Sequence, residues 1–369
     1  MRATRAIIHL NNFYKNIELI RGKIGPHVDI CFVVKANAYG HGMVPMAEFA
    51  LKAGVNCLGV ASVNEGIKLR QAGINTRIFV FSQSLPEEIK DIIDTRLIPL
   101  VNDEDFINAL SVSASDGIQE VHLKVDTGMG RLGCRPEEAV KLAALITGKK
   151  NLKLGGVMTH FSVADSINPE HIIYTKKQIA SFLEIIDEIR KAGINPGQIH
   201  AANSGAVCFH DESFFDMVRL GILAYGYSPA DGVPGGLITK PIMELRSAVV
   251  FIKKIQAGEK ISYGCTWTAS ENTYIGVLPI GYADGLPWLL SNQYSVLIRG
   301  KSYPIIGVVC MDQCVVNLGN SGEVQRWDEA VIFGPGFSDA CDIANKFGGL
   351  PFEILCNINE RVPRVYINE

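Results

Sequence analysis

The first two-thirds of the chain alternates short apolar runs with longer segments whose apolar residues recur at helical spacing. Continuous apolar runs are typical of strands that are buried on both faces of a parallel sheet. They predict strands at residues 31–35, 57–62, 77–82, 97–102, 121–126, 154–161, 199–203 and 217–224. The segments between them predict helices, for example at 43–52, 64–71, 136–145 and 171–191.

Three of the predicted helices end in the same way, with Ala-Gly-Val-Asn at 53–56 and Ala-Gly-Ile-Asn at 72–75 and 192–195. A glycine just past a helix takes the left-handed conformation that closes it, and the apolar residue after it packs back. Eight strand–helix units in roughly 230 residues match the size of a (β/α)₈ TIM-type barrel. A doubly wound open sheet remains the alternative.

After about residue 231 the pattern changes to short β-prone segments separated by turns. Strands are predicted at 247–254, 274–279, 295–299, 304–309 and 329–333, with one helix at 339–347. This pattern favours a barrel domain at 1–232 and a mostly β domain at 233–369, joined at the Gly- and Pro-rich stretch 231–236. The segment 5–10 has no helix before it and is open to pairing with the second domain instead of the barrel.

Composition narrows the function classes. The chain has 369 residues, of which 47% are hydrophobic and 20% charged, with a net charge of −3. This near-neutral balance argues against a nucleic-acid surface or a polybasic membrane anchor. No apolar stretch is long enough to span a bilayer, and the N-terminus lacks a signal-peptide core, so we expect a cytoplasmic protein. Its nine cysteines form no CxxC pair, which argues for reduced thiols without a disulfide framework or a metal site.

Polar and charged side chains follow the predicted barrel strands, where the active site of such a barrel lies. A cluster rich in Lys, His and Arg with few carboxylates suits an anionic ligand. The residues in question are Lys35, Lys124, Asp126, Arg131, His160, His200, Asn203, Ser204, Arg219, Gly221 and Tyr225.

Lys35 is the most informative of these residues. It follows an apolar run, so its side chain is expected to enter a largely dry cavity. A desolvated lysine loses proton affinity and becomes a nucleophile for aldehydes. The alternative is a strand-end lysine whose ammonium reaches solvent, and the residues alone leave both open.

Eight motifs, in order along the chain, resemble segments of the alanine racemase family, whose members are pyridoxal-phosphate enzymes of the fold type III barrel class. They are VVKANAYGHG (33–42), VDTGMGRLG (125–133), THF (159–161), AANSGA (201–206), VRLGI (218–222), SYGCTW (262–267), GYADG (281–285) and CMDQ (310–313). The resemblance covers nearly the whole chain. It implies a (β/α)₈ barrel followed by a β domain, in agreement with the pattern above.

The resemblance implies that Lys35 holds pyridoxal 5′-phosphate as a Schiff base and acts as the base on one face of the substrate Cα. Tyr263 would be the base on the other face, since racemisation must remove a proton from one side and return it to the other. The alternative for Tyr263 is a buried aromatic residue on a strand.

The remaining roles are also carried over from the resemblance. Arg219 would face the pyridine nitrogen, and His160 and His200 would link it to Tyr263, although either histidine could be an ordinary core residue. Arg131 would bind the substrate carboxylate with the Met311 backbone N–H, and Lys124, as a carbamate, would position Arg131. The other expected cofactor-binding residues, mostly at the phosphate, are Tyr39, Asn203, Ser204, Gly221 and Ile222.

The family implies a head-to-tail homodimer in which the second domain completes the site of the other subunit. Tyr263, Met311 and Asp312 would act there, and Tyr282 would lie at the entrance. A monomer would then lack one catalytic base. The implied activity interconverts L- and D-alanine and supplies D-alanine for peptidoglycan.

Three positions depart from the family pattern. Phe352 replaces a tyrosine whose hydroxyl contacts the cofactor phosphate, and Trp288 and Val308 replace common arginines. A serine or broad-spectrum racemase of the same fold therefore stays open. A barrel-fold decarboxylase would use a carboxylate where this chain has Arg219, and a non-catalytic cofactor carrier would lack the second domain.

Overall fold

The structure, a computed structural model, describes residues 2–115, 117–228 and 237–368. The chain forms two compact units. The barrel unit comprises Tyr14–Ala38 and Met43–Lys240, and the β unit comprises Met1–Phe13, Tyr39–Gly42 and Pro241–Glu369. The predicted junction at 231–236, with the predicted boundary between 232 and 233, lies outside the described residues.

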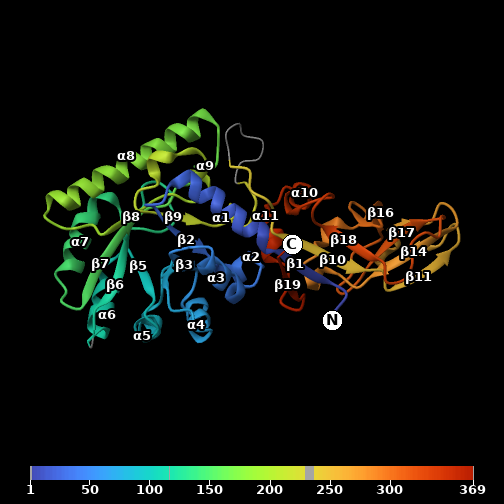
Figure 1. The fold of residues 1–369 in the computed structure, drawn as a ribbon, viewed down its shortest axis with the longest axis horizontal. Coiled ribbons are helices and arrows are strands. Elements are labelled where there is room, and N and C mark those ends of the chain that lie inside the picture. The colour runs from blue at the N-terminus through green and yellow to red at the C-terminus, as the bar shows by residue number, and fades with distance from the viewer. Residues whose placement is uncertain (1, 116, 229–236, 369) are drawn as a thin grey trace. The chain divides into compact units, whose positions relative to one another are not determined.

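Eight parallel strands form the wall of the barrel unit (Figure 1). They are β2 (Asp29–Val33), β3 (Cys57–Val60), β4 (Arg77–Val80), β5 (Ile98–Val101), β6 (Gln119–Lys124), β7 (Leu152–Met158), β8 (Gln198–His200) and β9 (Met217–Leu220), in the order β8-β7-β6-β5-β4-β3-β2-β9. Backbone hydrogen bonds from Asp216 N to Ile199 O (3.0 Å) and from Arg219 N to Ala202 O (2.9 Å) join the chain segments at β8 and β9. The predicted TIM-type barrel is therefore confirmed.

Helices alternate with these strands around the outside (Figure 1). They are α1 (Leu10–Ile24), α3 (Met43–Lys52), α4 (Val63–Gln71), α5 (Ile89–Asp94), α6 (Glu104–Ser113), α7 (Ala139–Thr147), α8 (Pro169–Lys191) and α9 (Ser204–Phe209). The segment α2 (Lys35–Tyr39) is a left-handed turn and not a regular helix. The repeated helix ends behave as predicted: Gly54, Gly73 and Gly193 have φ of 81°, 84° and 77°.

Each predicted barrel run overlaps one strand, but every strand ends earlier than predicted. After five of the strands, β2, β6, β7, β8 and β9, the apolar pattern continues into the following loop, because its first residues include buried apolar side chains. Ala201 and Ala202 follow β8 and are fully buried outside any strand. At the other side of the barrel interior, Cys31, Cys57, Phe79, Ile98 and Met217 form one packed cluster.

The β unit contains a nine-stranded sheet. Its order is β11 (Phe251–Ile255), β14 (Thr273–Leu278), β17 (Cys314–Gly319), β16 (Lys301–Ile306), β15 (Ser295–Ile298), β18 (Glu329–Phe333), β10 (Met243–Ala248), β1 (Arg5–His9) and β19 (Arg364–Ile367). The segment at 5–10 thus pairs with the second domain, since β1 lies antiparallel to β10 and parallel to β19. Two short antiparallel strands, β12 (Lys260–Ile261) and β13 (Trp267–Thr268), flank the segment that contains Tyr263.

Two predictions for this unit were wrong. The single strand expected at 247–254 is two strands, because the chain changes partners in between: Val249 N donates to Asp328 O and Val250 N to Val277 O. The sequence also predicted one helix, whereas the unit contains α10 (Ala340–Asn345) and α11 (Pro351–Cys356). Pro351 at the first position of α11 begins that short helix, which Phe347-Gly348-Gly349 separates from α10.

In the described part of the chain, no helix combines the length and apolar character needed to cross a bilayer.

Candidate active site

The backbone enters the left-handed region of φ and ψ directly after Lys35, the predicted cofactor lysine. Lys35 follows β2, and residues 36–39 all have positive φ angles between 51° and 54°. This conformation costs L-residues roughly 1–2 kcal/mol each, so other contacts must hold the turn. Glu65 provides such contacts, because its carboxylate accepts hydrogen bonds from Ala36 N at 2.7 Å and Ala61 N at 2.8 Å. The strained turn fixes the direction in which Lys35 leaves the strand.

Arg219, on β9, is buried and held from several sides. Its Nη2 donates to Thr159 O and Ala201 O, both at 2.8 Å, and to His160 Nδ1 at 3.1 Å. Its Nη1 donates to His200 Nδ1 at 3.2 Å. Burial lowers the pKa of Arg219 to about 10, which still leaves it charged at neutral pH. Arg219 therefore contacts both histidines, and their predicted link onward to Tyr263 stays a prediction.

A chain of hydrogen bonds continues from Arg219 through the barrel interior. A guanidinium has donors only, so His200 Nδ1 accepts and His200 Nε2 carries that ring's proton. His200 Nε2 lies 2.9 Å from His122 Nδ1, and His122 Nε2 lies 3.5 Å from Glu120 Oε1. His122 and then Arg77 lower the pKa of Glu120 to about 2, although its burial acts in the opposite direction. His122 Nε2 also lies 3.4 Å from Arg77 Nη2, so Arg219 fixes the tautomer of His200, while His122 faces a cation and an anion together.

Burial also keeps His160 and His200 uncharged. Desolvation and the neighbouring Arg219 lower the pKa of His160 well below its ordinary value. Desolvation and then His122 do the same for His200. His200 is therefore a core residue and a partner of Arg219 at once, whereas His160 is half-buried and contacts Arg219 from the side of the loop after β7.

Lys124 ends β6 with its side chain only 5% exposed. Desolvation, followed by the charges of Arg219 and Arg131, lowers the pKa of Lys124 to about 8, and Lys35 contributes in the same direction. Several cations therefore share a small, partly dry region. Such a region favours the binding of an anion, as the sequence predicted.

Arg131 lies on a loop organised by one carboxylate. Asp126 accepts hydrogen bonds from Gly128 N at 2.9 Å, Met129 N at 2.8 Å and Gly130 N at 2.9 Å. Burial alone would raise the pKa of Asp126, but these backbone donors bring it below its ordinary value. The carboxylate therefore stays ionised and holds the loop that carries Arg131 at the carboxyl end of β6.

The expected phosphate-binding residues meet between α9 and the end of β9. Gly221 N donates to Ser204 Oγ at 3.0 Å, so this hydroxyl and a phosphate would compete for the same N–H. Asn203 caps α9, since its Oδ1 accepts from Ala206 N at 3.0 Å. Ile222 is buried beside them. Ser204 and Gly221 are therefore in direct contact, and Asn203 acts on the backbone; their role at a phosphate stays a prediction.

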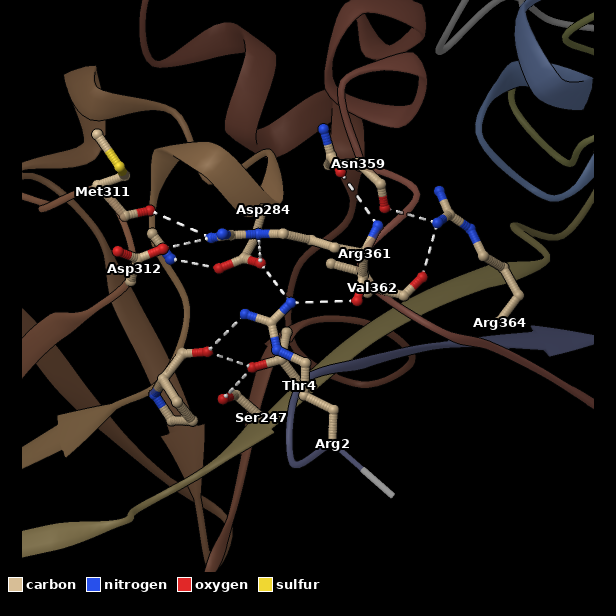
Figure 2. Close-up of polar contacts among 12 residues, drawn as sticks. Arg2, Thr4, Ser247, Asp284, Met311, Asp312, Asn359, Arg361, Val362 and Arg364 are labelled. Atoms are coloured by element: carbon tan, nitrogen blue, oxygen red, sulfur yellow. Dashed lines mark hydrogen bonds and ion pairs between the residues drawn. The ribbon is translucent and has the colours of Figure 1, made fainter.

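The predicted residues of the β unit are exposed. Tyr263 is 75% exposed, Met311 53% and Tyr282 46%, so the interpretation of Tyr263 as a buried aromatic residue is wrong. Tyr282 N donates to Cys310 O at 3.0 Å, which joins the turn of Tyr282 to the loop of Met311. Asp312, the neighbour of Met311, forms an ion pair with Arg361 (Figure 2).

The loop of Tyr263 is tied to the same region. Ser262 Oγ donates to Val308 O at 2.7 Å. Asn292 accepts from Gly307 N at 2.6 Å and donates to Thr266 Oγ1 at 3.1 Å. Tyr263, Met311 and Tyr282, to which the sequence assigned different roles at one site, therefore stand on hydrogen-bonded loops of one unit.

Tyr39 and Phe352 are neighbours within the β unit, with ring centroids 6.3 Å apart and planes inclined by 50°. Burial raises the pKa of Tyr39 above its ordinary value. In the barrel unit, Tyr225 was named among the polar residues that follow the strands. It is fully buried, packs against Phe32 and donates to Val33 O at 2.9 Å, so it is a core residue.

Comparisons with known proteins cover both units. A sequence model of the alanine racemase N-terminal domain matches residues 8–229, and one of the C-terminal domain matches residues 242–366. Alanine racemase of Treponema denticola is 50% identical over 100% of this chain and 99% of its own length. The chain belongs to the alanine racemase family.

Solved structures agree with this assignment. Alanine racemase of Clostridium difficile 630 matches with a TM-score of 0.95 at 34% identity, over 100% of this chain and 96% of that one. Alanine racemase of Bartonella henselae, described with covalently bound pyridoxal phosphate, matches with a TM-score of 0.88 at 26% identity, over 100% of both chains.

In this alanine racemase family member, four polar residues that the structure connects to the site were not identified from the sequence. His122 and Glu120 extend the chain from Arg219, and their signal was polar side chains within a strand predicted to be buried on both faces. Asp284 lies inside the GYADG motif. Arg361 has no sequence signal, because its partners are distant along the chain.

Proposed function

We propose that the chain is a homodimeric alanine racemase that interconverts L- and D-alanine with pyridoxal 5′-phosphate. The observation that carries the proposal is the cluster of Lys35, Lys124, Arg131 and Arg219 at the carboxyl ends of the barrel strands, where their charges influence one another. This cluster fits an anionic cofactor together with a substrate carboxylate. The relatives support the same activity, since they are alanine racemases, and one is described with this cofactor bound covalently.

Lys35 and Tyr263 would move the Cα proton. The chemistry that bound pyridoxal phosphate supplies is withdrawal of electrons from the amino acid's Cα, which makes its proton acidic. Lys35 would bind the cofactor and exchange the proton on one face, and Tyr263 on the other. Arg131 and the Met311 N–H would hold the substrate carboxylate, so that the Cα–H bond points at one of the two bases.

Arg219 distinguishes this proposal from a decarboxylase of the same barrel class. Its guanidinium offers only donors, so it would donate to the pyridine nitrogen without placing a proton on it. The carbonyls of Thr159 and Ala201 hold it in one position. A barrel-fold decarboxylase would carry a carboxylate where this chain has Arg219.

The exposed residues of the β unit support the dimer. Tyr263, Tyr282 and Met311 share the unit with the exposed apolar side chains of Trp288 and Leu289. Aromatic residues and methionine on linked loops are typical of protein interfaces. We propose that a second copy of the chain covers them, so that each active site takes Lys35 from one subunit and Tyr263 from the other. A cytoplasmic location and supply of D-alanine for peptidoglycan belong to the same proposal.

Exchange of the Cα proton tests this function. Purified protein supplied with pyridoxal phosphate and L-alanine in D₂O is expected to produce D-alanine with deuterium at Cα. Initial rates on L-serine and L-lysine decide the substrate range, and a rate on either that equals the rate on alanine would indicate a broad-spectrum racemase. Release of CO₂ without inversion would contradict the proposal.

Phe352→Tyr is expected to tighten cofactor binding. The new hydroxyl would lie beside Tyr39 and supply a hydrogen bond to the phosphate, worth about 1.5–3 kcal/mol or roughly 10- to 100-fold in the dissociation constant. Titration of the apoprotein with pyridoxal phosphate measures the effect. Phe352→Leu is the control, because it removes the ring without adding a hydroxyl and is not expected to tighten binding. An unchanged constant in Phe352→Tyr would rule out this role.

Lys124 is expected to form a carbamate as the pH rises. The neutral amine reacts with CO₂, and because the pKa of Lys124 is lowered to about 8, a useful fraction is neutral near pH 7–8. The resulting anion would stand among Arg131, Arg219 and Lys35. Isotope-labelled bicarbonate should give a carbamate NMR signal that weakens in acid and disappears in Lys124→Ala, but persists in Lys153→Ala. A signal that survives Lys124→Ala would assign the carbamate elsewhere.

A further inference from the structure

Asp284 is a buried carboxylate between two arginines of the β unit. It is 0% exposed and lies at the end of the short helix η5 (Tyr282–Asp284). Its Oδ1 lies 2.6 Å from Arg2 Nη1 and 2.7 Å from Arg361 Nε, and its Oδ2 accepts from Gly281 N at 3.0 Å (Figure 2). A charge without water around it is stable only when paired in this way, so its contacts are well defined.

Arg361 connects this buried anchor to an exposed loop. While its Nε binds Asp284, its Nη2 lies 2.8 Å from Asp312 Oδ1 and 3.5 Å from Met311 O (Figure 2). One guanidinium therefore spans two loops. Lysine offers a single ammonium and could not contact both partners in the same geometry.

The two loops are also held together through their backbones. Ala283 N donates to Met311 O and Tyr282 N to Cys310 O, both at 3.0 Å. A side chain at Gly281 would collide with this loop, since a Cβ there would lie 2.2 Å from Cys310 O and 2.4 Å from Met311 O. The orientation of the Met311 peptide thus depends on the turn that Asp284 fixes.

We propose that Arg361 and Asp284 are positioning residues that set the Met311 peptide for binding the substrate carboxylate. This inference rests on the proposed function, in which Met311 completes the site of the second subunit. An exposed ion pair such as Arg361 with Asp312 is worth little by itself. Here the arginine is anchored by a buried carboxylate, so its loss releases the loop instead of merely removing a surface contact.

Arg361→Lys is expected to raise KM for alanine about 10-fold and to change kcat less. A misplaced N–H weakens carboxylate binding in both the ground state and the transition state, and such uniform binding appears in KM. Arg299→Lys is the matched control, because Arg299 pairs with Asp328 and contacts neither loop. Asp312→Ala removes only the exposed ion pair with Arg361, so it should raise KM by a smaller factor without changing thermal stability. This variant keeps the inference testable if Arg361→Lys folds poorly.

Mixed dimers separate this inference from the proposed function. The first dimer combines an Arg361→Lys subunit with a Lys35→Ala subunit. Only the barrel of the Arg361→Lys subunit keeps Lys35, and its site is completed by the β unit of the other subunit, in which Arg361 is intact. KM should therefore be that of the wild type. The second dimer combines wild type with a variant that carries both Lys35→Ala and Arg361→Lys. Its one active site joins the wild-type barrel to the altered β unit, so KM should be raised. Equal, unchanged KM values in two active dimers would overturn the positioning role. A raised KM in the first dimer, in which Arg361→Lys lies on the same subunit as the active barrel, would instead contradict the shared site of the proposed function.

Discussion

Replacing Tyr263 by phenylalanine is expected to lower racemisation by about 10²–10⁴-fold, the contribution of a positioned acid or base. The hydroxyl is the only group that the variant removes, so cofactor binding should stay intact. Lys35 remains, and with it proton exchange on its own face of the Cα. In D₂O the variant should therefore exchange the Cα proton of one enantiomer of alanine and not of the other.

This selectivity distinguishes a lost base from a damaged fold. Tyr274→Phe is the control, because Tyr274 belongs to β14 of the same unit and its ring contacts Lys254, not the site loops. It should exchange both enantiomers at the wild-type rate. Equal loss of both exchange reactions in Tyr263→Phe would show that Tyr263 acts on structure and is not a second base.

Lys35→Ala is expected to abolish racemisation, with a loss of about 10⁴-fold, because the same amine binds the cofactor and exchanges a proton. Two buried or half-buried lysines, Lys35 and Lys124, lie close enough for their charges to interact. Borohydride reduction followed by denaturation identifies which one carries the cofactor. The label should stay on wild type and on Lys124→Ala and be lost in Lys35→Ala. A label lost in Lys124→Ala instead would transfer the role to that residue.

The barrel could be predicted from the sequence because each of its strands is buried on both faces and reads as an apolar run. The residues at which the strands end could not be predicted, because buried loop residues such as Ala201 and Ala202 continue the same apolar pattern. In the β unit, the break at Val249 and Val250 was missed for a related reason. The apolar pattern runs through it, while the change of strand partner depends on Asp328 and Val277, which lie far along the chain.

For the site, the sequence indicated which residues carry chemistry but not how they are held. Lys35 and Tyr263 stand in recognisable motifs. The tautomer of His200 depends on Arg219, and the Met311 loop depends on Arg361. Both dependencies are contacts between residues distant along the chain. Tyr225 was grouped with the polar residues that follow the strands, but its hydroxyl donates to Val33 O in the core.

The central claim is that each active site combines Lys35 of one subunit with Tyr263 of the other. Lys35→Ala and Tyr263→Phe proteins, each nearly inactive alone, are co-assembled with different affinity tags and the mixed dimer is isolated. One of its two sites then contains both wild-type residues, so it should regain about half of the wild-type kcat per dimer. A mixed dimer that stays as inactive as its parents would contradict the shared site.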